Sequence, residues 1–158
     1  MIIEKKTVIK ALKTENLEYE SFFSASEDVS HRQCSVCAVG AIIRKSLGRK
    51  MKKIIKNGYP TILSLYCIEL TDGAYIGENV KKLLKNKNYL GALSCYFESF
   101  SDDFDGNVVP EVEEKLVEFV RKNFPTRFKV KDFEEFKKEK TKLEKDMKAE
   151  IAYMYGTI

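Results

Sequence analysis

His31, Cys34 and Cys37 are the residues whose types and spacing could do chemistry. The pattern His-x2-Cys-x2-Cys would place three zinc ligands within two turns of a helix. A fourth ligand from Cys67 or Cys95 would complete the tetrahedron that zinc prefers. The same spacing is compatible with a thiol-dependent enzyme in which His31 acts as the base for a neighbouring cysteine.

Other features of the same segment favour structural thiols over a reactive site. His31 is the only histidine of the chain, and the second pair of ligands that structural zinc sites usually show is missing. Cys34 and Cys37 lie in an apolar segment, where cysteine commonly acts as a small hydrophobic residue. We therefore expect no catalytic residue and no cofactor. Zinc bound by His31, Cys34 and Cys37 is the alternative.

The segment around these cysteines predicts a buried central helix over residues 31–47. Ser30 and Gln33 have the spacing of a capping box, which places the first helical residue at His31. The segment is then apolar on every side for two turns, as is typical of a helix inside a core. Gly48 is the expected end of the helix.

A basic stretch follows over residues 44–56. It contains no acidic residue and seven cations, which are Arg44, Lys45, Arg49, Lys50, Lys52, Lys53 and Lys56. Such a charge run is usually a solvated helix face. It could also contact phosphate groups with a salt-dependent affinity, which makes a nucleic-acid-binding accessory protein an alternative function.

The remaining apolar patterns predict an all-α or mainly α fold in a compact single domain over residues 1–158. Over residues 61–70 the apolar run is too short to separate helix from buried strand by pattern, and we favour a helix. Further helices are expected over residues 4–17, 50–56, 78–85, 89–100 and 110–123.

The C-terminal segment, residues 132–156, predicts one long charged helix from Phe133 to about Tyr155. Twelve of the seventeen residues from 134 to 150 are charged. Its narrow apolar stripe includes Phe136, Leu143 and Met147. A stripe this narrow needs a covering surface, because an isolated helix of this length is marginal in water. We expect an interaction arm for a partner or a homodimer.

Composition limits the class of protein. The chain has 158 residues, of which 44% are hydrophobic and 33% charged, with a net charge of +4. Such a chain can bury a core, and its charge is lower than that of most strong nucleic-acid binders. The start of the sequence has no apolar region of a signal peptide, and no run is long enough to span a bilayer. We therefore expect a cytoplasmic protein that does not enter membranes.

Three short runs resemble small proteins of bacteriophages and other mobile elements to which no activity is assigned. They are Cys-Ser-Val-Cys-Ala-Val-Gly-Ala at 34–41, Tyr-Leu-Gly-Ala-Leu at 89–93 and Leu-Val-Glu-Phe-Val-Arg-Lys-Asn-Phe-Pro at 116–125. The resemblance implies a phage origin and a cytoplasmic location in the host cell. It leads us to expect a non-enzymatic binding protein that engages or inhibits a host macromolecule, first of all a host protein.

Overall fold

The computed structural model describes residues 1–14, 16–19, 36–56, 60–74, 77–101 and 106–154. The chain divides into two compact units, one formed by residues 2–129 and the other by residues 130–158 together with Met1. The sequence predicted a single domain over 1–158 with 132–156 as an arm.

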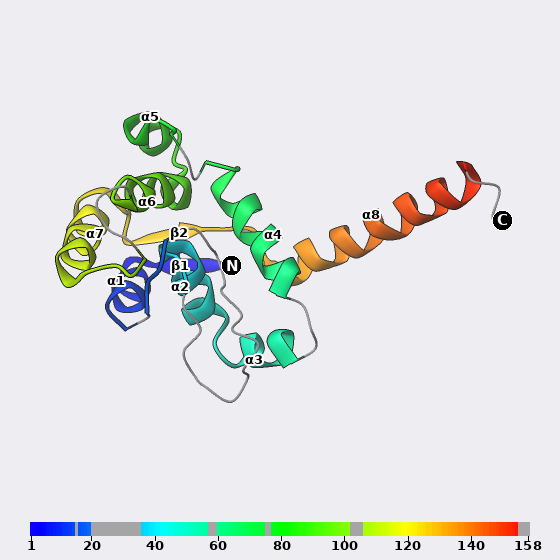
Figure 1. Ribbon diagram of the computed structural model, residues 1–158, viewed down its shortest axis with the longest axis horizontal. Helices are drawn as coiled ribbons and strands as arrows, with labels where there is room; N and C mark the ends of the chain where they lie inside the picture. The colour runs from blue at the N-terminus through cyan, green and yellow to red at the C-terminus, as the bar shows by residue number, and fades with distance from the viewer. Residues whose placement is uncertain (15, 20–35, 57–59, 75–76, 102–105, 155–158) are drawn as a thin grey trace. The chain divides into compact units, whose positions relative to one another are not determined.

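The prediction of a mainly helical fold is confirmed. Within the described residues the structure has eight helices and one two-stranded sheet (Figure 1). In chain order the elements are β1 (Ile2–Glu4), α1 (Lys5–Thr14), α2 (Ala38–Leu47), α3 (Arg49–Lys56), α4 (Pro60–Thr71), α5 (Val80–Lys85), α6 (Tyr89–Glu98), α7 (Pro110–Asn123), β2 (Arg127–Lys129) and α8 (Phe133–Met154).

The sheet was not predicted from the sequence. Strand β1 pairs antiparallel with β2, and the buried residues Ile3 and Phe128 lie opposite each other. The backbone N–H of Lys5 then donates to the carbonyl of Thr126 at 2.8 Å. Helix α1 starts directly after β1, at Lys5. Because β1 pairs with β2, the N-terminal and C-terminal ends of the unit formed by residues 2–129 lie side by side.

The start of α2 differs from the expected one. The helix begins at Ala38 and not at His31, because Val36 forms a parallel bridge with Leu17 and is extended. The N–H of Val36 donates to the carbonyl of Asn16 at 3.1 Å. The expected capping box, Ser30 and Gln33, lies outside the described residues. Seven of the ten residues of α2 are buried, and the helix contacts α1, α4 and α6.

Helix α4 confirms the helical interpretation of residues 61–70. Its last residue, Thr71, is buried, and its hydroxyl donates to the carbonyl of Cys67 at 3.0 Å. The Asn88 side chain links this end of α4 to the start of α6. Its Nδ2 donates to the Thr71 carbonyl at 3.1 Å, and its Oδ1 accepts the N–H of Gly91 at 3.0 Å.

Aromatic side chains join α6, α7 and β2. The rings of Tyr89, Phe124 and Phe128 lie 5.5 to 5.7 Å apart between centroids. The ring of Tyr96 stacks on that of Phe119 at 4.4 Å. Phe124 and Phe128 are buried, so these ring pairs help to hold α6, α7 and β2 together.

In the second unit, backbone hydrogen bonds pair Met1 with Val130 at 2.8 and 2.9 Å. Asp132 caps the following helix, since its Oδ1 accepts the N–H of Glu134 at 3.0 Å. Helix α8, coloured orange to red in Figure 1, then runs over Phe133–Met154. Among the helices of the described residues, none has the length and apolar character needed to cross a membrane.

Candidate binding surface on helix α3

A one-residue turn sets the direction of α3. Gly48 lies between α2 and α3 with a φ of +54° and a ψ of −125°, a conformation that favours glycine. Its N–H donates to the carbonyl of Arg44, and its own carbonyl accepts the N–H of Met51, both at 3.1 Å. Helix α3 therefore starts directly at the end of α2.

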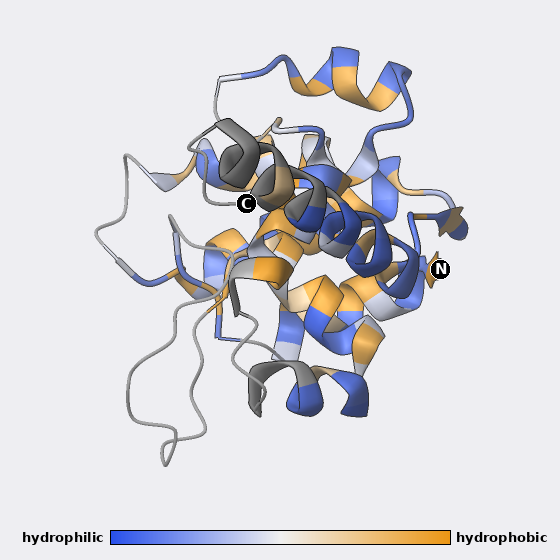
Figure 2. Ribbon diagram, turned by 90° about the vertical axis from the view of Figure 1, so that its right-hand side faces the viewer, coloured by the Kyte–Doolittle hydropathy of each residue, from blue (hydrophilic) through white to orange (hydrophobic). Residues whose placement is uncertain are grey.

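In the described part of α3 the charged side chains face solvent and the apolar side chain of Met51 is buried. Met51 is only 3% exposed, whereas Arg49, Lys50, Lys52 and Lys53 are exposed. At about 100° per residue these four positions span roughly 160° of the helix circumference, centred opposite Met51. The described part of α3 is mostly blue in Figure 2, at the bottom of the view.

We define the basic α3 face as the four exposed cations of α3 together with the exposed last-turn residue of α2. Its members are Lys45, Arg49, Lys50, Lys52 and Lys53. None of them forms an ion pair with a described carboxylate. Helix α7 differs, because it pairs Lys115 with Glu111 at 2.9 Å and Arg121 with Glu118 at 3.8 Å. Arg44 is half-buried and takes part in an interaction of its own, so it is not counted in the face.

The positions of these charges oppose the stability of α3 itself. Its first turn holds Arg49 and Lys50 and no acid, although the positive end of a helix dipole favours acids. Arg49 and Lys53, four residues apart, also repel each other. A cation in the first turn costs about 0.3–1 kcal/mol at low ionic strength, and a like-charge pair four residues apart costs about 0.2–0.5 kcal/mol. Violations of local rules of this kind are expected at functional sites.

The described thiols lie in the core and are poor nucleophiles. Cys37 is the N-cap of α2, and its Sγ accepts the N–H of Gly40 at 3.4 Å. Burial raises the pKa of Cys37 to about 12. Burial, followed by the nearby Cys37 thiol, raises the pKa of Cys67 well above its usual value. Burial also raises the pKa of Cys95, whose Sγ donates to the carbonyl of Ala74 at 2.7 Å.

The zinc alternative remains a prediction. His31 and Cys34 lie outside the described residues. In the part of the chain that the structure describes, no three histidine, cysteine or acidic side chains gather as a metal site would require.

Of the three apolar residues predicted for the C-terminal arm, Phe136 is the one whose side chain the structure describes. Phe136 is 6% exposed, and the Lys131 Nζ lies 5.8 Å from the centre of its ring. The side chains of Leu143 and Met147 lie outside the described part of the chain.

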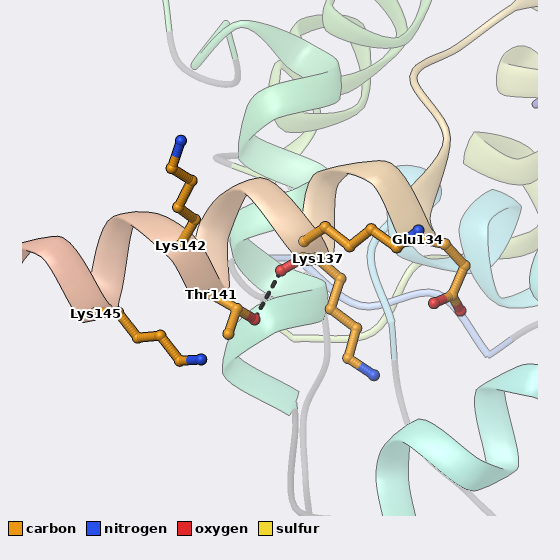
Figure 3. Close-up of a pocket in the computed structure, with 6 residues that line it drawn as sticks. Glu134, Lys137, Thr141, Lys142 and Lys145 are labelled. Atoms are coloured by element: carbon orange, nitrogen blue, oxygen red, sulfur yellow. Dashed lines mark hydrogen bonds between the residues drawn. The ribbon is translucent and has the colours of Figure 1, made fainter.

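A shallow hollow lies along α8 (Figure 3). The described residues that line it all belong to this helix and are Glu134, Lys137, Lys138, Thr141, Lys142 and Lys145. The Thr141 hydroxyl donates to the carbonyl of Lys137 at 2.8 Å. In Figure 3 the side chains of Lys142 and Lys145 point in different directions. The charged side chains that line the hollow therefore do not converge on a single ligand.

A groove beside α7 was not predicted from the sequence. Its lining consists of Lys13 from α1 and of Pro110, Glu111, Glu113, Glu114, Lys115, Val117, Glu118 and Arg121 from α7. Burial raises the pKa of Glu113. Two of the other acids, Glu111 and Glu118, form ion pairs within α7 with Lys115 and Arg121. The acids of the first turn of α7 were visible in the sequence, but there they indicated only a favourable helix start.

Comparison with known protein families, with curated proteins and with solved structures found no match for this chain.

Proposed function

We propose that this chain is a non-enzymatic binding protein of phage origin that engages or inhibits a host macromolecule in the host cytoplasm. The observation that carries the proposal is the basic α3 face, with five exposed cations and no described carboxylate paired to them. A partner can approach these charges without breaking an ion pair to a described carboxylate. Long-range attraction to an acidic partner would also speed its association.

The distribution of charge supports this assignment. The net charge of the whole chain is only +4, and the basic α3 face alone carries five positive charges. Over the rest of the chain 23 basic and 24 acidic residues nearly balance, whereas residues 44–56 hold seven cations and no acid. A charge excess needed only for solubility has no reason to gather in this way.

The form of the face favours a macromolecule over a small ligand. Small-molecule sites are concave and bury most of their ligand. The side chains of Arg49, Lys50, Lys52 and Lys53 instead diverge over roughly 160° of one helix. An extended partner with several spaced negative charges can contact them together.

An enzyme that uses the cysteines has less support. A nucleophilic thiol needs a lowered pKa and access to solvent. Of His31, Cys34 and Cys37, the structure describes Cys37, which is buried and whose pKa is raised to about 12.

The C-terminal helix, residues 132–156, is proposed as a second interaction surface. Helix α8 extends over 22 residues, and the apolar stripe of its sequence is too narrow for a central core helix. A second copy of the chain is the partner that we propose for this arm. We also propose a central role for the helix predicted over residues 31–47, and the contacts of α2 (Ala38–Leu47) with α1, α4 and α6 support it.

Affinity capture from host lysate tests the proposed function. The variant Lys52→Glu/Lys53→Glu reverses two charges of the basic α3 face. The matched control Lys81→Glu/Lys82→Glu makes the same change on α5, where both lysines are also exposed. We expect the first variant to lose the host macromolecule that the wild type retains and the second to keep it. Equal retention by all three proteins would contradict a role for this face.

A further inference from the structure

We infer that the basic α3 face binds the phosphate backbone of double-stranded nucleic acid without reading its base sequence. This inference rests on the proposed function, in which the same face binds a macromolecule, and it names the class of partner. It departs from the host protein expected from the sequence.

The composition of the face fits a polyanion better than it fits an acidic protein surface. Four of its five residues are lysines. Protein interfaces are depleted in lysine and rely on aromatic, methionine and arginine side chains as anchors. The one methionine of this segment, Met51, is buried, and residues 44–53 contain no aromatic residue. Among its described side chains the face therefore offers charge and no apolar anchor, which is sufficient for contacts to phosphate.

The same composition favours the backbone of a duplex over unpaired bases or base edges. Proteins that bind single strands stack the bases on aromatic rings, and residues 44–53 supply none. Base edges are read by arginine or lysine at guanine, by asparagine or glutamine at adenine and by acidic side chains at cytosine. The basic α3 face holds only the first of these types and contains no asparagine, glutamine or acidic residue. Binding by this face should therefore depend on phosphate spacing and not on sequence.

A phosphate would also relieve the electrostatic conflict within α3. Arg49 and Lys50 lie in the first turn of the helix, where their charges add to the positive end of the dipole. An anion bound at a helix start interacts favourably with the dipole and with such side chains at the same time. The arrangement that destabilises the free helix is thus the one that strengthens phosphate binding.

Fluorescence anisotropy with labelled duplexes tests the inference. Two unrelated duplexes of about 20 base pairs, and one single strand, are titrated over a salt series from about 50 to 200 mM. For five neutralised phosphates, a plot of log K against log salt should have a slope of about −4.5. We expect the same affinity for both duplexes and weaker binding to the single strand.

The two charge-reversal variants locate the contact. Lys52→Glu/Lys53→Glu should bind the duplexes at least about tenfold more weakly and reduce the slope by about 2, because two phosphate contacts are lost. Lys81→Glu/Lys82→Glu changes the net charge equally and should retain most of the affinity. Circular dichroism of each variant checks that the fold is intact.

Several results would overturn the inference. They are the absence of duplex binding at about 50 mM salt, equal losses in both variants, tighter binding to the single strand, or a clear preference for one duplex sequence. Repeating the affinity capture with nuclease-treated lysate distinguishes failure of this inference from failure of the proposed function. If a host protein is still captured through Lys52 and Lys53 after nuclease treatment, the nucleic-acid assignment is wrong and the binding function stands. If the Lys52→Glu/Lys53→Glu variant affects neither duplex binding nor capture, both proposals fail.

Discussion

The thiol of Cys37 shows how the environment of one residue decides its chemistry. Near a helix start, a thiolate would be stabilised by the dipole and would be a good nucleophile. Burial of the side chain outweighs this effect and raises the pKa of Cys37 to about 12. The thiol therefore stays protonated at neutral pH and serves as a helix cap.

Stability should depend on this thiol at alkaline pH. In the unfolded chain Cys37 ionises near its ordinary value of 9.0, whereas the folded state binds the proton up to about pH 12. Stability is thus fully present below about pH 9 and is lost as the pH rises toward 12. The loss is roughly 1.4 kcal/mol per pH unit for one thiol. Urea unfolding measures it, and in Cys37→Ser this dependence should weaken. Fast alkylation of folded Cys37 near neutral pH would contradict this account.

Gly91 and Asn88 provide a second residue-scale prediction. A Cβ at Gly91 would lie 2.6 Å from the Nδ2 of Asn88, whose side chain caps α6. Gly91→Ala should therefore destabilise the protein by about 1–3 kcal/mol, although alanine normally favours a helix by about 1 kcal/mol.

Asn88→Ser supplies the control for this clash, because serine can cap a helix with a shorter side chain. In the Asn88→Ser background, Gly91→Ala should cause little loss of unfolding free energy. A double-mutant cycle measures this coupling between the two positions. Equal losses in both backgrounds would show that another contact opposes the Cβ.

At the scale of elements, periodicity identified the helices whose sequences are amphipathic. Helices α5, α6 and α7 lie where their apolar spacing and flanking residues place them. The two three-residue strands escaped prediction because so short a segment shows no period, and their pairing joins positions far apart in the chain. The start of α2 was misplaced because Val36 pairs with Leu17, a tertiary contact that local capping signals do not contain.

The C-terminal helix supports a truncation experiment. Phe133 and Phe136 are buried, and Lys131 pairs with Glu139 at 2.6 Å. A chain ending at Glu139 keeps these contacts and removes the rest of the arm. We expect it to unfold cooperatively, because residues 2–129 form a compact unit of their own, and to lose self-association.

Circular dichroism and size-exclusion chromatography with light scattering measure the two properties. If the truncated chain shows no cooperative melting transition, residues 140–154 of α8 belong to the core. A truncated chain with unchanged oligomeric state would remove the reason for calling this segment an interaction arm.

At the scale of the whole molecule, the sequence identified the charged residues of the candidate site but not their arrangement. All five members of the basic α3 face belong to the basic stretch predicted over residues 44–56. The sequence could not show that Met51 is buried opposite these charges or that they lack described ion-pair partners. Both properties depend on how α3 packs on α2, which local patterns do not encode.

Lysine footprinting tests the central claim, binding through the basic α3 face, most directly. The folded protein is acylated briefly with and without host lysate, and mass spectrometry follows the labelling of each lysine. The claim predicts that lysate slows labelling of Lys50, Lys52 and Lys53 at least several-fold, because binding covers their amino groups. It predicts unchanged labelling of Lys81 and Lys82, which are exposed on α5. Unchanged labelling of the α3 lysines in lysate would contradict the claim.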